Sequence, residues 1–266
     1  MNMIVCCKQV LDPEAPPASF KIDSSSNQVV PPPNVPPVIS PFDENAVEAA
    51  LKIKDQNGGN ITVISLGNNL VRDVVKKPLS MGSDELVLLE DEAFEGGDSW
   101  STAYALSEAI KKIGEYDIIF GGRQAADWDS GQVGSGIAEL LGIPCVTLAK
   151  KVEVADNKLK VERVIPDGYQ VVEVTPPVLI TVSNELGEPR YATLKGIMAA
   201  AKKQPTIWKP ADIGLDSSKI GASGRITKLQ KVFQPVREGK CDLVEADSPA
   251  EAGTKLAEKL REAKLV

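Results

Sequence analysis

The strongest constraint on the fold of this chain is a polar, glycine-rich loop that joins an apolar run to a helical segment. The loop spans Gly121–Gly134, after the apolar run Tyr116–Phe120 and before the helical start Ile137–Leu141. Glycines let a backbone approach phosphate closely, and the free N–H groups of a helix start attract anions. Asp127 and Asp129 suit sugar hydroxyls or amines, since carboxylates repel phosphate. The pattern predicts a site for a phosphorylated ligand, with a surface loop that caps a helix as the alternative.

Apolar runs alternate with helical patterns along the first 140 residues. The predicted buried strands are Met3–Gln9, Ile61–Leu66, Leu86–Leu89 and Tyr116–Phe120. The predicted helices run from Pro41 to about Gln56, over 70–81 with strain or shortening at Pro78, and from an N-cap at Asp98 to about Ile113. This alternation indicates an α/β fold with a doubly wound, mainly parallel sheet. Ligands of such sheets bind beyond the carboxyl ends of the strands, here expected at Gln9, Leu66 and Gly121.

The other segments have different patterns. Residues 11–41 are rich in proline and predict an irregular excursion with a small ribbon at 20–22 and 28–30. Strands predicted over 146–154, 158–164, 171–174 and 178–182 form an antiparallel extension of the sheet.

The C-terminal quarter predicts a second region. A polar loop over 184–191 leads into a short helix over 193–203, and 206–225 looks like a linker. Ser248–Glu251 is a capping box that starts a helix over 249–264. We therefore expect a nucleotide-binding domain over 1–205 and a C-terminal arm over 206–266, folded back on its own domain or reaching another chain.

Composition excludes several classes of function. The chain has 266 residues, a net charge of −7 and no histidine. The acidic balance argues against nucleic-acid binding, and the missing histidine excludes histidine acid–base catalysis and histidine metal sites. Four cysteines without CxxC spacing make zinc or iron–sulfur ligation unexpected. With no signal peptide and no run of 18 apolar residues, a cytoplasmic location without membrane insertion is expected.

Three blocks of this sequence resemble the β subunit of electron transfer flavoproteins, and the resemblance covers nearly the whole chain. The first block combines Val5–Val10 with Ser40–Glu48, the second is Gly122–Val133, and the third and most specific is Glu188–Leu194. The resemblance implies a Rossmann-like, adenine-nucleotide-binding fold. It also implies a heterodimer with a homologous α subunit that carries a FAD, and an arm over 206–266 that packs on this subunit.

The resemblance further implies that this chain holds a cofactor of its own, either AMP or, as in electron-bifurcating members, a second FAD. The implied cofactor-binding residues are Cys6, Ser40, Pro41, Phe42, Asp43, Leu66, Gly122, Arg123, Gln124, Ala125, Ala126, Asp127, Trp128, Asp129, Ser130, Gly131, Gln132 and Val133.

The third block is similar to the recognition loop with which these proteins bind partner dehydrogenases. The implied partner-binding residues are Glu188, Pro189, Arg190, Tyr191 and Leu194. Leu194 is expected as an exposed anchor that fills a pocket on the partner, unless it faces the core from the 193–203 helix. Arg190 and Tyr191 have the alternative role of bracing the loop.

The sequence favours a second FAD but leaves AMP open. Asp43–Glu48 resembles the DxNAxE pattern of bifurcating members, and Ser130–Pro144 resembles their QVG, IAE and LGIP run. Two departures weaken this match: Trp128 stands where those members have glycine, and Gly134-Ser135 replaces their Gly-Pro.

The FAD alternative implies electron donors and acceptors. NADH is the expected donor, with Asp98, Ser99 and Thr102 near it or simply capping a helix. The expected partners are an acyl-CoA dehydrogenase-type or other flavin dehydrogenase, and ferredoxin or flavodoxin. No catalytic side chain is expected, because the cofactor carries the redox chemistry. The competing hypotheses are a nucleotide-binding stress or regulatory protein and an adenylating enzyme of the same α/β superfamily.

Overall fold

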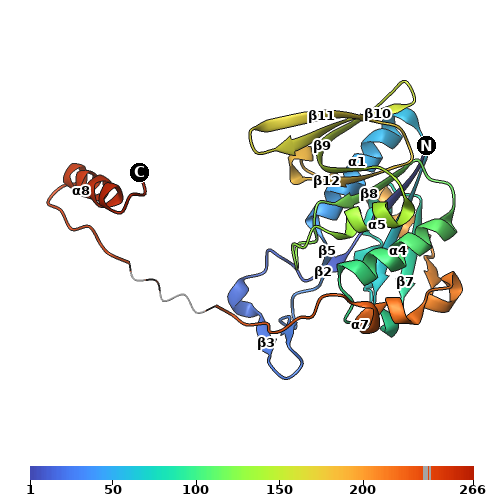
Figure 1. The fold of residues 1–266 in the computed structure, drawn as a ribbon, viewed down its shortest axis with the longest axis horizontal. Coiled ribbons are helices and arrows are strands. Elements are labelled where there is room, and N and C mark those ends of the chain that lie inside the picture. Colours follow the sequence, from blue (N-terminus) through green and yellow to red (C-terminus); the bar gives the residue numbers. More distant parts are fainter. Residues whose placement is uncertain (236–238, 240) are drawn as a thin grey trace. The chain divides into compact units, whose positions relative to one another are not determined.

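A nine-stranded, mainly parallel sheet forms the centre of the computed structural model, which describes residues 1–235, 239 and 241–266 (Figure 1). The strand order is β11-β10-β9-β12-β8-β1-β6-β7-β13. The strands are β1 (Asn2–Cys6), β6 (Asn60–Gly67), β7 (Glu85–Glu90), β8 (Ile118–Gly122), β9 (Cys145–Ala155), β10 (Lys158–Ile165), β11 (Gly168–Val174), β12 (Val178–Val182) and β13 (Thr206–Trp208). The predicted doubly wound α/β fold is confirmed.

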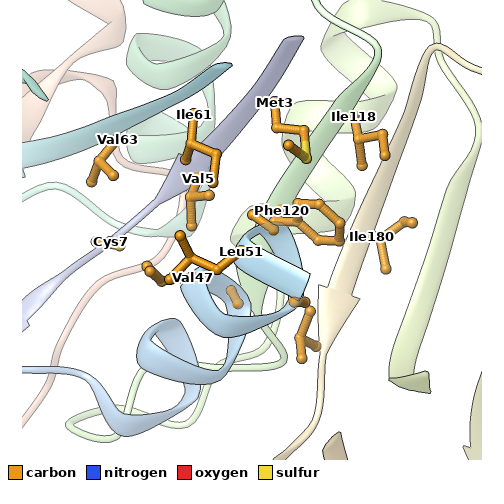
Figure 2. Packing of buried hydrophobic residues seen from close by; sticks show 14 of the residues in the cluster. Met3, Val5, Cys7, Val47, Leu51, Ile61, Val63, Ile118, Phe120 and Ile180 are labelled. Carbon is orange, nitrogen blue, oxygen red and sulfur yellow. The ribbon is translucent and has the colours of Figure 1, made fainter. Parts of the chain in front are cut away.

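Helices cover both faces of this sheet and close two apolar layers. Helix α1 (Pro41–Asn57) packs on one face, while α4 (Ser99–Ile113) and α5 (Val133–Leu141) pack on the other. Figure 2 shows the α1 layer, where Val47 and Leu51 lie against Val5 and Phe120. All four side chains are almost completely buried, and each such side chain contributes roughly 1.5–3 kcal/mol to the stability of the fold.

The first strand is shorter than the sequence predicts. It ends at Cys6, and Gln9 belongs instead to the short strand β2 (Gln9–Val10), which pairs with β5 (Val38–Ile39). The chain leaves the sheet here because the Lys8 N–H donates to the Asp43 carboxylate and not to a neighbouring strand. The proline-rich excursion also carries the predicted ribbon, as β3 (Lys21–Asp23) and β4 (Gln28–Val30).

The helix predicted over 70–81 is divided in two. Its parts are α2 (Arg72–Val75) and α3 (Lys77–Met81), and Pro78 lies in the first turn of α3. Proline has no N–H to continue the helix before it, whereas the first turn of a helix needs no such donor.

The extension after residue 144 is only partly antiparallel, which corrects the prediction. β9 pairs with β10 and β10 with β11 in antiparallel fashion, but β12 is parallel to both β8 and β9. The chain therefore returns into the main sheet after the hairpin, which places Val178–Val182 completely inside the core.

The prediction of a linker over 206–225 is wrong. β13 pairs in parallel with β7 as the last strand of the sheet, and Ile220 is buried in the apolar layer around α4. The carboxylate of Asp98 also accepts hydrogen bonds from the N–H groups of Ile226 and Thr227. These contacts extend the first compact unit to Gln230, so residues 206–230 belong to the main domain. A three-residue strand beside prolines has too short a pattern to be recognised from sequence.

The second unit, Lys231–Val266, contains the predicted C-terminal helix as α8 (Pro249–Glu262). Ser248 caps it by accepting from the Glu251 N–H at 3.2 Å, but the Glu251 carboxylate accepts from Asp247 N–H, so the capping box is not reciprocal. Leu256 on the apolar face of α8 is 48% exposed. In the part of the chain that the structure describes, no helix is long and apolar enough to span a membrane.

Candidate functional site

The carboxyl ends of three central strands form the floor of the candidate site. Cys6 lies opposite Ile64 of β6 and Gly121 of β8. Because side chains alternate along a strand, Cys6, Leu66 and Gly121 share one face, which α4 and α5 cover. The sheet is extended in opposite directions from β1 and β8, which makes their ends a topological switch point. A Cβ atom added at Gly121 would meet no atom within 4 Å, so space is open above this floor.

The start of α5 borders this space with free N–H groups. Gln132 is the N-cap residue, and in the described structure no side chain caps the helix and no acidic residue lies in its first turn. The first N–H groups of a helix have no intrahelical partner, and the helix dipole favours an anion there. Two glycines bring α5 close to its neighbours: a Cβ at Gly134 would lie 2.7 Å from Thr181 Cγ2, and one at Gly136 2.9 Å from Ala103 Cβ.

A buried carboxylate ties the loops of the site together. The Asp43 carboxylate accepts from the N–H groups of Lys8 at 2.8 Å and Gly122 at 2.9 Å. The Ser40 hydroxyl, also fully buried, accepts from Ala126 N–H at 3.3 Å. Both carboxylate oxygens of Asp43 are thus used inside the protein, so its side chain holds the loops in place.

Burial changes the titration of the groups around Asp43. Desolvation raises the pKa of Asp43 from 3.8 to about 7, against the opposing effect of the two N–H donors and the Lys8 charge. Desolvation, with the Asp43 charge added, raises the pKa of Cys6 to about 12 and that of Cys7 well above its ordinary value. Both thiols are therefore neutral at physiological pH.

The loop over 122–133 is held by its own polar side chains. The Lys8 ammonium pairs with Asp127 at 2.7 Å, which neutralises that carboxylate, and Gln124 Nε2 donates to Asp129 at 2.8 Å. Ser130 contacts Ser99 of α4 at 3.2 Å between the hydroxyl oxygens. Asp129 and Gly131 adopt left-handed backbone with φ of 51° and 62°, which turns the chain into α5.

Arg123 places a cation at the ends of β8 and β12. Its Nη1 donates to the Ser183 hydroxyl at 3.2 Å, while its buried Nε has no partner among the described residues. Buried polar groups nearly always have a hydrogen-bond partner, so this N–H is suited to a ligand oxygen. Of the other predicted residues, Pro41 is exposed at the start of α1, and Phe42 packs under Gly122. Ala125 accepts from Asp129 N–H.

The structure also places Trp128 and the start of α4. The indole of Trp128 is 61% exposed. Asp98 caps α4 through Ser101 N–H at 3.0 Å and also holds the chain at Ile226 and Thr227. Although burial opposes it, these N–H donors and the Thr227 hydroxyl lower the pKa of Asp98 to about 2. Its carboxylate is therefore fully used as a structural group.

The recognition loop, residues 184–203, has a braced half and an exposed half. Arg190 forms ion pairs with Glu48 and Asp55 of α1, both at 2.8 Å, so it braces the loop. Tyr191 and Leu194 are 94% and 75% exposed, which excludes the core-facing alternative for Leu194. Helix α6 (Leu194–Lys202), capped by Thr193, continues the exposed surface.

The other two predicted residues of this block lie in the braced half, directly before Arg190, with Glu188 exposed and Pro189 half-buried.

Two contributing residues were missed in the sequence. Lys8 pairs with Asp127, and Glu48 holds Arg190. Each lies within a block that carries the family resemblance, but its partner is more than 60 residues away along the chain. Such pairings have no periodicity that a single sequence reveals.

Gly122→Ala tests the close packing beneath the loop. A Cβ there would lie 2.6 Å from Asp43 Oδ1 and 2.7 Å from Phe42 Cβ, so the backbone must shift. We expect the free energy of unfolding in urea to fall by roughly 1–3 kcal/mol. Gly121→Ala, where a Cβ meets nothing, is the control and changes it by less than about 0.5 kcal/mol. Equal losses in the two variants contradict this packing.

Asp43→Asn tests the raised pKa of the buried carboxyl. Between pH 4 and 7 folded Asp43 binds its proton more tightly than unfolded Asp43, so its contribution to stability falls as pH rises and levels off above about pH 7. The difference in unfolding free energy between wild type and variant should fall by up to about 1.4 kcal/mol per pH unit over pH 5–7. The chain has no histidine to obscure this range. Parallel pH profiles of the two proteins would show that Asp43 titrates normally.

Comparison with known proteins agrees with this arrangement. A family model described as the electron transfer flavoprotein domain matches residues 34–213. The chain is 42% identical over 263 residues to electron transfer flavoprotein subunit beta of Clostridium acetobutylicum, covering 98% of each chain. It is 38% identical over 267 residues to caffeyl-CoA reductase-Etf complex subunit CarD of Acetobacterium woodii, covering all of both chains. Protein FixA of Azorhizobium caulinodans is 38% identical over 267 residues, 97% of this chain and 93% of its own. The chain therefore belongs to the electron transfer flavoprotein family, among its β subunits.

Proposed function

We propose that this chain pairs with an α subunit and holds a FAD of its own in the space above the ends of β1, β6 and β8. The observation that carries the proposal is that no side chain caps the start of α5, which follows directly on the loop over 122–133. The backbone of this loop donates hydrogen bonds to Asp43 and Ser40. An uncapped helix start without an acidic residue in its first turn suits a diphosphate, and the orphan Arg123 Nε supplies one further donor. The residues present therefore fit an adenine dinucleotide.

The exposure of Trp128 and the pattern over Asp43–Glu48 support FAD over AMP. Trp128, the one bulky departure from the bifurcating pattern, is 61% exposed and is therefore not packed into the protein core. Asp43–Glu48 keeps the DxNAxE pattern, and two of its members, Asp43 and Glu48, make the contacts that fix the loops. AMP is the alternative, in which the nucleotide is structural and the α-subunit flavin alone shuttles electrons.

When bound, FAD would supply the redox chemistry. The residues of this chain would bind and orient it: the α5 start and Arg123 would hold the phosphates, and the backbone at Cys6, Leu66 and Gly122 would line the nucleotide. At neutral pH the Cys6 thiol keeps its proton, because its pKa is raised to about 12, whereas burial raises the pKa of Asp43 to about 7. In this proposal NADH donates electrons, which pass to a flavin dehydrogenase of the acyl-CoA dehydrogenase type and to ferredoxin or flavodoxin.

Two other regions have roles in assembly. The second unit carries an amphipathic helix, α8, with an unburied apolar face, which suits packing on the α subunit. The exposed half of the recognition loop suits transient docking of a dehydrogenase, since a single apolar anchor contributes about 1.5–3 kcal/mol.

Counting cofactors tests the proposal directly. The chain is co-expressed with its α subunit, purified as the complex and denatured, and the released nucleotides are identified by mass and absorbance. We expect two FAD per heterodimer. One FAD and one AMP supports the simple shuttle instead. A homodimer without flavin contradicts both and supports a regulatory nucleotide-binding protein.

Leu194→Ala tests the docking anchor. The variant should keep its cofactors, while kcat/KM for electron exchange with an acyl-CoA dehydrogenase falls about tenfold or more, since roughly 1.4 kcal/mol of binding corresponds to tenfold. Val171→Ala, which truncates a half-exposed apolar side chain on β11, is the matched control and should leave the kinetics unchanged. If the two variants behave alike, Leu194 is not the anchor.

A further inference from the structure

One face of α1 forms hydrogen bonds with the recognition loop. Asn45 Nδ2 donates to the Gly187 carbonyl at 2.8 Å, and Lys52 Nζ donates to the Leu186 carbonyl at 3.3 Å. Glu48 accepts from Arg190 N–H at 3.1 Å, from its Nε at 2.8 Å and from its Nη2 at 3.1 Å. These α1 residues are spaced three and four apart, which places them on one side of the helix. A single helix face therefore fixes the course of the loop over 186–190.

The buried member of this set is Glu48. It is 4% exposed and receives three hydrogen bonds from one arginine, including one from the backbone. A buried carboxylate without a cation is strongly disfavoured, so Glu48 requires Arg190 at this position. Asp55 also forms an ion pair with Arg190. Its side chain is exposed to solvent, and an exposed ion pair contributes little to stability.

The fixed residue lies directly before the exposed ones. Tyr191 directly follows Arg190. Leu194 lies four residues after Arg190, at the first position of α6 behind its cap Thr193. A docking side chain whose backbone is already ordered loses less conformational freedom on binding. We infer that Glu48 is a positioning residue for partner docking: through Arg190 it holds the recognition loop in its docking conformation before the dehydrogenase arrives.

This inference rests on the proposed function and predicts a specific kinetic signature. Glu48→Gln keeps the shape of the side chain but removes the charge that holds Arg190. In the complete αβ complex, KM for an acyl-CoA dehydrogenase should rise about tenfold while kcat and cofactor content stay unchanged. Hydrogen exchange at the amides of residues 187–193 should be faster. Asp55→Asn is the matched control and should change neither measurement.

The double variant Glu48→Gln/Arg190→Gln separates positioning from general damage. Because both residues act through one contact, KM of the double variant should equal that of Glu48→Gln alone. Additive increases, a fall in kcat, or loss of cofactor would overturn the inference. So would an unchanged KM with faster exchange, since the order of the loop would then not matter for docking. An effect of Leu194→Ala without one of Glu48→Gln rejects this inference alone, whereas a complex without flavin rejects the proposed function.

Discussion

The buried carboxylate of Asp43 is the interaction on which the candidate site depends. It joins the end of β1, the start of α1 and the end of β8, three segments that lie far apart in the sequence. The raised pKa of Asp43 shows the cost of placing a carboxylate there. An apolar residue would avoid that cost but would leave two backbone N–H groups unpaired, at about 1–3 kcal/mol each. The carboxylate thus satisfies the backbone N–H groups of the two loops that border the candidate site.

Other polar residues along helix α1 also hold distant loops in place, as Asp43 does. Its apolar side packs into the sheet, Ser40 and Asp43 at its start hold the loops after β1 and β8, and its next turns hold the recognition loop through Asn45 and Glu48. The motif Asp43–Glu48 therefore has a structural explanation of its own. Asp43, Asn45 and Glu48 are buried, and each satisfies the backbone or the side chain of a distant loop, whereas the half-buried Glu44 pairs with Lys77 of α3.

The sequence predicted the regular parts of this architecture because their signals are local. Alternating apolar strands and helices, the Asp98 cap, the effect of Pro78 and the ribbon in the proline-rich excursion are confirmed. The errors have one cause. The direction of β12 and the place of β13 depend on which strand lies next to them, and a short strand carries no information about its neighbour. The ties from Lys8 to Asp127 and from Glu48 to Arg190 were missed for the same reason.

Order in the buried part of the recognition loop explains how its exposed part avoids collapse. Tyr191, Leu194, Ile197 and Met198 are all at least half exposed, and apolar side chains on an unrestrained loop would fold back onto the nearest apolar surface. The Glu48–Arg190 pair, the Asn45 contact and the Thr193 cap fix the backbone on both sides of Tyr191. These contacts are polar and short in range, so they fix the loop without covering its apolar side chains. The loop is held by polar contacts where it meets α1 and exposes apolar side chains from Tyr191 onward, which is the combination that the proposed docking would require.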